Sequence, residues 1–161
     1  IVRPGILMYG LTPLYGERAG KIRAELGIMP ALSFRTRVVF VKRCQAGTPI
    51  GYGATYVTER DCIIATLPIG YADGFPRGLS NQGEVLIRGM KLPVVGRVCM
   101  DECMVCAGDL ELDMEDEVVA IGKQGAEEIV AEEVAEKLGT VTHEVLCGIS
   151  KRVPRVYLPE M

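Results

Sequence analysis

Two glycine-containing stretches of this sequence carry side chains that could bind a ligand or do chemistry. They are residues 70–77, which read GYADGFPR, and residues 94–101, which read VVGRVCMD. The side chains that could contact a ligand there are Tyr71, Asp73, Arg77, Arg97, Met100 and Asp101. Glycine permits positive φ and a close approach to a ligand, and loops held by a rigid sheet often carry function. The alternative interpretation is two ordinary β-turns with a solvated arginine and aspartate.

A third stretch, GYG at residues 51–53, places Tyr52 between two glycines. A phenol ordinarily titrates near pH ~10, so a tyrosine acts as a general base only where cations or donors favour its ionised form. The flanking glycines would let the backbone sit close to a ligand. The spacing alone favours the alternative, a strand tyrosine that packs its ring.

The cysteines are the residues that could suggest a metal site. The sequence contains six of them, and Cys99, Cys103 and Cys106 form a C-x3-C-x2-C run. Successive residues of a strand face opposite ways, and the single histidine, His143, lies far away in sequence, so we predict no metal site. Reduced thiols inside apolar strands instead indicate a cytoplasmic protein.

Length, charge and hydropathy exclude several classes of function. A chain of 161 residues is long enough for one well-packed domain. The net charge of −3 offers no basic face for a nucleic-acid backbone, so we predict no nucleic-acid partner. No apolar run approaches the ~20 residues of a membrane span and no signal peptide is recognisable, so we predict no membrane contact. Because the sequence begins with Ile1 rather than methionine, we expect a piece of a longer protein.

The elements that must position these residues change in type after residue 30. Before that point, the pattern predicts an apolar strand at Val2–Tyr9 and a helix at Glu17–Leu26 that ends at Gly27. A strand followed by a helix is typical of the last unit of an α/β domain. We therefore assign residues 1–30 to the end of such a domain.

From residue 31 onwards the sequence predicts a mainly β domain of seven or eight short strands. Apolar residues alternate or run together over short segments that are separated by turn residues. One of these predicted strands, Ile50–Val57, contains Tyr52. The clear helix of this part is Ala126–Leu138, in which apolar residues recur at helical spacing. We expect residues 31–161 to form this domain.

Four separated motifs together resemble one known family. They are GYG (51–53), GYADGFPR (70–77), VVGRVCMD (94–101) and ISKRVPR (149–155). Their order and spacing resemble the C-terminal domain of alanine racemase, a fold-type III pyridoxal 5′-phosphate (PLP) enzyme in which a (β/α)8 barrel precedes a β domain. The resemblance covers nearly the whole chain. It implies that residues 1–30 form the last strand and helix of the PLP-binding barrel and that residues 31–161 form the barrel-like C-terminal β domain.

The resemblance implies catalytic and cofactor-binding roles for several residues. Tyr52 resembles the second catalytic base, which a partner subunit contributes to the face opposite the Schiff-base lysine. Arg3 resembles the arginine that faces the pyridine nitrogen of PLP, and that nitrogen stays unprotonated because a guanidinium can only donate. Gly5 and Ile6 resemble the residues whose backbone N–H groups bind the cofactor phosphate. For Arg3 the alternative is a surface arginine that pairs with a carboxylate.

Other residues resemble the groups that bind or select the substrate in this family. Met100 and Asp101 resemble the pair near the substrate carboxylate, with the Met100 amide as the contact and a positioning role for Asp101. Tyr71, Arg77 and Arg97 resemble residues of the substrate corridor, where they would select substrates by size and charge. The alternatives are a structural methionine, a turn aspartate and scaffold residues.

The sequence departs from the family at one position near the cofactor phosphate. Alanine racemases carry a Tyr-Glu pair there, whereas this sequence reads His143-Glu144. Imidazole is shorter than a phenol and can be cationic near neutral pH. It could still donate a hydrogen bond to a phosphate or hold Tyr52, so we predict that His143 contacts the cofactor. The substrate is therefore alanine by default, with serine or a broader range of amino acids as the alternative.

The resemblance also implies an activity for the parent protein. It would be a PLP-dependent isomerase that interconverts L- and D-alanine by a two-base mechanism and supplies D-alanine for peptidoglycan. The lysine that forms the Schiff base lies outside this chain, so we expect the isolated chain to be inactive. The family's active site is shared between subunits, which implies a head-to-tail homodimer with a small amino-acid substrate.

Two other classes of function are open. A non-catalytic β-barrel module that binds a partner protein or small ligand would show no activity when the rest of the parent protein is present. A fold-type III decarboxylase of basic amino acids also joins a barrel to a β domain, but it uses a cysteine from the partner subunit. The motifs GYADGFPR and VCMD argue against the decarboxylase.

Overall fold

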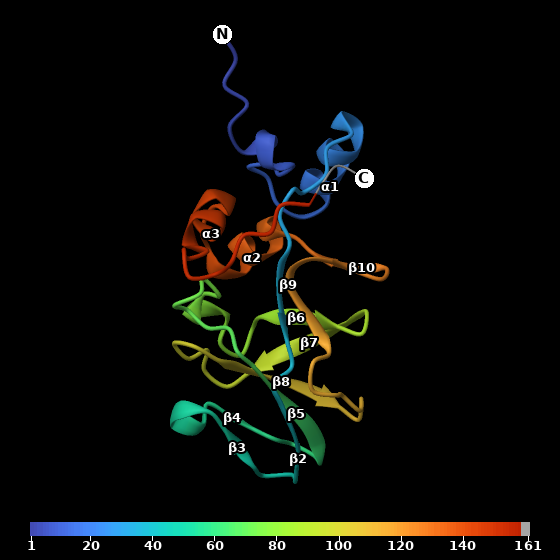
Figure 1. Cartoon of the computed structure of the whole chain (residues 1–161), viewed down its shortest axis with the longest axis vertical. Coiled ribbons are helices and arrows are strands. Elements are labelled where there is room, and N and C mark those ends of the chain that lie inside the picture. Colours follow the sequence, from blue (N-terminus) through green and yellow to red (C-terminus); the bar gives the residue numbers. More distant parts are fainter. Residues whose placement is uncertain (159–161) are drawn as a thin grey trace.

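The computed structural model describes residues 1–158, and its main feature is one antiparallel sheet with helices gathered at one end (Figure 1). The last three residues of the predicted 31–161 domain lie outside the described residues. The strands are β1 (Phe34–Arg37), β2 (Phe40–Cys44), β3 (Pro49–Ile50), β4 (Tyr56–Val57), β5 (Cys62–Leu67), β6 (Glu84–Ile87), β7 (Met90–Val95), β8 (Cys103–Gly108), β9 (Glu117–Gln124) and β10 (Glu127–Ile129). The prediction of a mainly β domain is confirmed.

Three α-helices and three short 3-10 helices complete the described chain. They are α1 (Gly16–Leu26), α2 (Ala131–Leu138), α3 (Thr142–Gly148), η1 (Gly5–Tyr9), η2 (Tyr52–Ala54) and η3 (Arg77–Leu79). The predicted helix at Glu17–Leu26 is confirmed as α1, which ends at Gly27 with φ of 63°. No helix within residues 1–158 is both long and apolar enough to cross a membrane.

The large sheet curls until its two edge strands meet. Its strand order is β1-β9-β6-β7-β8-β5-β2, with β10 paired to β9, so consecutive strands β1 and β2 lie at opposite edges. Only Val38 and Val39 separate them. The Val38 N–H donates to the Asp116 carbonyl, just before β9, at 2.9 Å, whereas the Val39 N–H donates to the Thr66 carbonyl of β5, the neighbour of the other edge strand, at 3.0 Å. The domain is therefore barrel-like, as predicted.

The interior of the curled sheet is a continuous hydrophobic core. Val85, Leu86 and Ile87 of β6 are fully buried, and β5 is buried along nearly its whole length. A smaller cluster lies under the β3–β4 hairpin, where Ile50 packs with residues of β2, β5 and β7. Burial of Ile50 holds this hairpin, and the turn at its tip, against the barrel.

Three predicted elements are wrong, each for a local reason. Val2–Tyr9 was expected as a strand, but within the described chain it finds no neighbouring strand, and Gly5–Tyr9 forms a 3-10 helix instead. Ile50–Val57 is divided by a turn into two strands of two residues each. The predicted helix Ala126–Leu138 begins only at Ala131, because residues 127–129 pair with β9 as β10.

A buried carboxylate joins the N-terminal helix to the β domain. Glu132 on α2 is only 1% exposed. Its Oε1 accepts a hydrogen bond from the Thr12 N–H at 3.1 Å, and the Arg23 guanidinium on α1 lies 3.4 Å from both carboxylate oxygens. A buried charge is tolerated only when it is paired and hydrogen-bonded, as it is here. The Tyr15 hydroxyl adds a contact by donating to the Thr140 carbonyl at 2.7 Å.

Replacing Glu132 with alanine in the complete protein is expected to lower the free energy of unfolding by about 3 kcal/mol. The substitution leaves the Arg23 charge and the Thr12 N–H without their partner, which is the costly way to break a buried pair. Glu136→Ala on the exposed face of the same helix is the control, expected to change stability by less than about 0.5 kcal/mol. Guanidinium denaturation measures both variants, and equal effects would contradict the anchoring role of Glu132.

Candidate active site

Tyr52 lies at the exposed tip of the β3–β4 hairpin, on the short helix η2. Its side chain is 74% exposed. Gly51 before it has φ of 69° and ψ of −174°, a conformation restricted to glycine, and Gly53 after it has φ of 73°. Both glycines are therefore required by the backbone, which turns sharply on either side and presents the phenol to solvent.

A pocket of about 620 Å³ brings Tyr52 together with five other predicted site residues. Its walls come from the hairpin tip, the 71–77 segment and the loop after β7. The lining residues are Tyr52, Tyr71, Arg77, Arg97, Val98, Cys99, Met100, Asp101 and Glu102. The predicted catalytic tyrosine, the predicted substrate-binding pair and the three predicted corridor residues thus share one cavity.

Positive charge lies close to the Tyr52 turn. A Cβ atom added at Gly53 would lie 3.6 Å from the guanidinium of Arg97, so this cation sits directly beside the turn. Arg77 lines the same pocket. Both guanidinium groups can donate hydrogen bonds to an anionic group in this pocket. Asp101 and Glu102 line the same pocket, so it also carries acidic groups.

Backbone hydrogen bonds join the motif at residues 70–77 to the motif at residues 94–101. The Tyr71 N–H donates to the Cys99 carbonyl, and the Ala72 N–H donates to the Met100 carbonyl, both at 3.0 Å. Gly70 makes this contact possible, since a Cβ atom there would lie only 2.3 Å from the Cys99 oxygen. The two motifs therefore form one rigid unit at the pocket.

Two polar residues that sequence reasoning missed hold the pocket walls in place. Asn81 donates to the Thr55 carbonyl at 3.3 Å and accepts from the Gly96 N–H at 2.6 Å. Ser80 accepts from the Val98 N–H at 3.0 Å. In the sequence, Ser80 and Asn81 are recognisable only as a polar pair that follows Leu79. Nothing local indicates that their partners lie 15 to 26 residues away.

The predicted cofactor-binding residues do not lie at this pocket. Arg3 and Gly5 are exposed and Ile6 is buried at the N-terminal end, whereas the β3–β4 hairpin forms the opposite end of the molecule (Figure 1). His143 is exposed on α3 and does not line the Tyr52 pocket. One chain therefore does not bring its own Tyr52 to its own Arg3.

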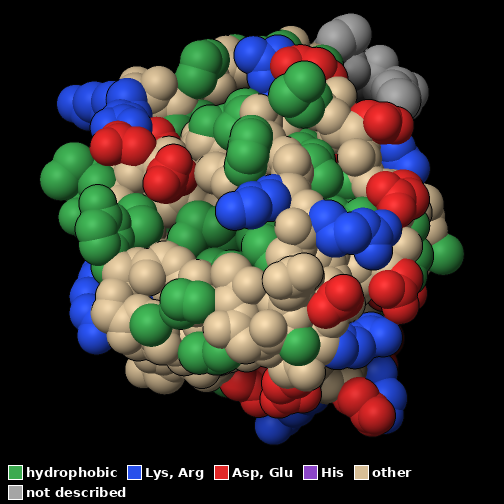
Figure 2. All heavy atoms as spheres, turned by 90° about the horizontal axis from the view of Figure 1, so that it is seen from below, with side chains coloured by type: hydrophobic (Ala, Val, Ile, Leu, Met, Phe, Trp, Pro, Cys, Tyr) green, Lys and Arg blue, Asp and Glu red, His purple; other side chains and the backbone are tan. Residues whose placement is uncertain are grey.

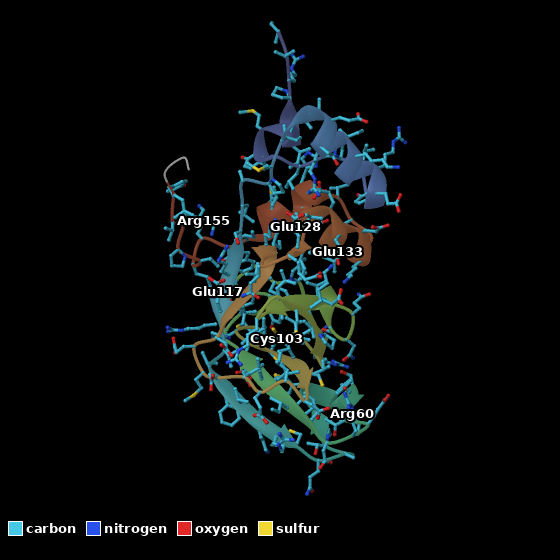
Figure 3. The ribbon with its side chains drawn as sticks, turned by 90° about the vertical axis from the view of Figure 1, so that its right-hand side faces the viewer. Arg60, Cys103, Glu117, Glu128, Glu133 and Arg155 are labelled. Carbon is cyan, nitrogen blue, oxygen red and sulfur yellow. The ribbon has the colours of Figure 1, made fainter. Side chains whose placement is uncertain are left out.

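The cysteines do not form a metal centre among residues 1–158. Cys103 lies inside the sheet (Figure 3), and burial raises its pKa to about 12. Burial, together with the nearby Glu102, also raises the pKa of Cys99 at the pocket. A neutral thiol is a poor nucleophile and a poor metal ligand.

Comparison with known sequences connects this geometry to one family. A family model described as "Alanine racemase, C-terminal domain" matches residues 31–157. The alanine racemase of Halothermothrix orenii is 50% identical over 158 residues, which are 98% of this chain and 40% of that protein. The chain therefore spans about two fifths of the length of the curated relatives it matches.

Solved structures of alanine racemases share the fold of this chain. That from Streptomyces coelicolor A3(2) has a TM-score of 0.90 at 36% identity, with 99% of this chain and 41% of that chain covered. That from Bartonella henselae, which has covalently bound pyridoxal phosphate, has a TM-score of 0.75 at 37% identity. It covers 81% of this chain and 36% of that chain.

Proposed function

This chain belongs to the alanine racemase family, and from that membership we propose that the complete protein interconverts L- and D-alanine with PLP as its cofactor. One observation carries the proposal. Residues from three motifs that are far apart in the sequence line a single pocket around Tyr52. Such a convergence of ionisable side chains in a cavity is typical of an active site.

In this proposal Tyr52 is one of two acid–base groups. PLP, when bound, supplies the electron sink that makes the proton on the substrate α-carbon removable. The Tyr52 oxygen removes or returns that proton on one face of the substrate, and a group outside this chain serves the other face. The exposure of Tyr52 supports the role, because the phenol is accessible to a substrate, and the Arg97 guanidinium lies beside the turn that carries it.

The other pocket residues bind and select the substrate. The Met100 amide contacts the substrate carboxylate, and Asp101 positions that segment. Tyr71, Arg77 and Arg97 form the corridor, where their size and charge favour a small anionic group. Their common pocket supports these roles.

Two features of the N-terminal residues suit a bound PLP. Arg3 is exposed and has no ion-pair partner among the described residues, so its guanidinium is free to face the pyridine nitrogen. Gly5 and Ile6 begin η1, where the first backbone N–H groups have no acceptor within the helix and can bind a phosphate. Residues 1–30 are on this view the end of the PLP-binding barrel. His143 is the fourth residue that we assign to the cofactor.

The separation of these residues supports a head-to-tail homodimer. The N-terminal end, which carries Arg3, and the β3–β4 hairpin, which carries Tyr52, lie at opposite ends of one chain (Figure 1), so a site that contains both residues requires two copies. The end that carries β2–β4 exposes hydrophobic side chains among acidic and basic ones (Figure 2), and Phe40 is 55% exposed. A second subunit would cover this surface. A cytoplasmic location and the supply of D-alanine for peptidoglycan stay predictions.

An assay of the complete protein tests the proposed function. With PLP present, L-alanine and L-serine should be incubated in parallel and their D-enantiomers measured. We expect turnover of alanine to exceed that of serine, and the isolated 161-residue chain to show none. Higher turnover of serine would favour the serine racemase that His143 suggests. Absence of turnover with both substrates would favour a non-catalytic module.

A further inference from the structure

Arg152 contacts two carboxylates that come from two different motifs of the pocket region. Its Nε donates to Asp73 Oδ1 at 2.7 Å, and its Nη2 donates to Asp101 Oδ1 at 2.5 Å. The three residues are far apart in sequence, and the segment that carries Arg152 does not line the pocket itself. Both carboxylates also raise the pKa of Arg152, so the guanidinium stays charged.

Asp73 connects this arginine to the glycine turn. The Asp73 side chain is 13% exposed, and its second oxygen accepts from the Gly70 N–H at 2.9 Å. The Asp73 carbonyl accepts from the Ser150 N–H at 3.0 Å. The turn and the segment that carries Arg152 are thus held together by both backbone and side-chain hydrogen bonds.

The same turn supports the segment that we assign to the substrate carboxylate. The Tyr71 and Ala72 N–H groups of this turn donate to the carbonyls of Cys99 and Met100. Gly70 lies so close to these two carbonyls that an added Cβ atom would overlap with them. The Arg152 side chain also donates to Asp101, the residue directly after Met100. One guanidinium therefore ties the turn to the Met100–Asp101 segment.

The charges show why this contact matters for an anionic ligand. Asp101 and Glu102 both line the pocket, and the Asp101 side chain is 60% exposed. An uncompensated carboxylate there would repel the carboxylate of an amino acid. Arg152 compensates Asp101 at contact distance, while Arg77 and Arg97 remain available on the pocket wall.

We propose that Arg152 is a positioning residue of this active site, which holds the Met100–Asp101 segment and offsets the Asp101 charge so that the pocket accepts a substrate carboxylate. The inference rests on the proposed function. It predicts an effect on substrate affinity more than on the chemical step, because Arg152 does not touch the reacting atoms.

The test is a set of variants of the complete PLP-loaded protein. Arg152→Gln should raise KM for alanine by about tenfold and change kcat by less than about threefold. Adding Asp101→Asn to that variant should bring KM part of the way back, because it removes the repulsive charge but does not rebuild the tie to the segment. Arg152→Lys keeps the charge but cannot bridge both carboxylates, so its KM should be intermediate.

Arg60→Gln is the matched control, because Arg60 also pairs with an aspartate, Asp109, at 3.2 Å. Arg60 lies at the β2–β4 end of the molecule (Figure 3) and does not line the pocket. Its KM should equal that of the wild type. The inference is overturned if KM is unchanged in Arg152→Gln, or if Asp101→Asn fails to restore it. If Arg152→Gln does not fold, an unchanged KM in Arg152→Lys overturns it equally.

Failure of this inference is distinguishable from failure of the proposed function. The wild-type protein tests the function alone, because it either racemises alanine or does not. An active wild type with an unaffected Arg152→Gln variant removes only the role of Arg152. Melting temperatures of all variants separate a loss of fold from a change in affinity, since a purely structural arginine would not be rescued by Asp101→Asn.

Discussion

Replacing Tyr52 with phenylalanine in the complete protein is expected to lower kcat for alanine racemisation by ~10²- to 10⁴-fold, the range typical of a lost general acid–base group. The substitution removes only the phenolic oxygen. The hairpin should fold unchanged, because Tyr52 is exposed and its backbone is determined by Gly51 and Gly53. Racemisation should fall in both directions, and the absorbance of bound PLP should be retained.

Tyr56→Phe provides the matched control for this experiment. Tyr56 lies on the same hairpin and loses the same single oxygen, but it packs against the small hydrophobic cluster and does not line the pocket. Its kcat should stay within about threefold of the wild type, as expected for a residue that takes no part in proton transfer. If Tyr52→Phe retained full activity in both directions, the phenol would have no place in the mechanism.

Replacing Gly70 with alanine is expected to have the second-largest effect, on both activity and stability. The added Cβ would lie 2.3 Å from the Cys99 oxygen and 2.4 Å from the Met100 oxygen. Both obstacles are backbone atoms, so the turn and the Met100 segment must move apart. Such overpacking typically costs about 1–3 kcal/mol. Because Met100 and Asp101 line the pocket, kcat/KM should fall together with the melting temperature.

Gly20→Ala is the matched control for that substitution. Gly20 lies within α1, and a Cβ atom there would have no neighbour within 4 Å in this chain. Alanine in a helix interior is favoured over glycine by roughly 0.5–1 kcal/mol, so this variant should be slightly more stable and equally active. Wild-type kcat/KM in Gly70→Ala would show that the two motifs need not be in close contact.

The sequence indicated the local elements well where glycine and apolar spacing act over a few residues. The helix that ends at Gly27 follows from such a pattern. The same reasoning failed at Ile50–Val57, where apolar residues suggested a continuous strand but Gly51 and Gly53 divide it. It also failed at Ala126–Leu138, because the pairing of residues 127–129 with β9 prevails over helix propensity.

The motifs contained the residue types of the candidate site, since a glycine-bounded tyrosine or arginine is recognisable from a few neighbours. Their meeting in one pocket depends on contacts between distant segments, such as Asn81 with Gly96 and Arg152 with Asp101. Local periodicity carries no signal for such pairs, because each partner is ordinary in its own segment. Only the tertiary structure brings these segments together, and it also sets the N-terminal end, which carries Arg3, opposite the β3–β4 hairpin, which carries Tyr52 (Figure 1).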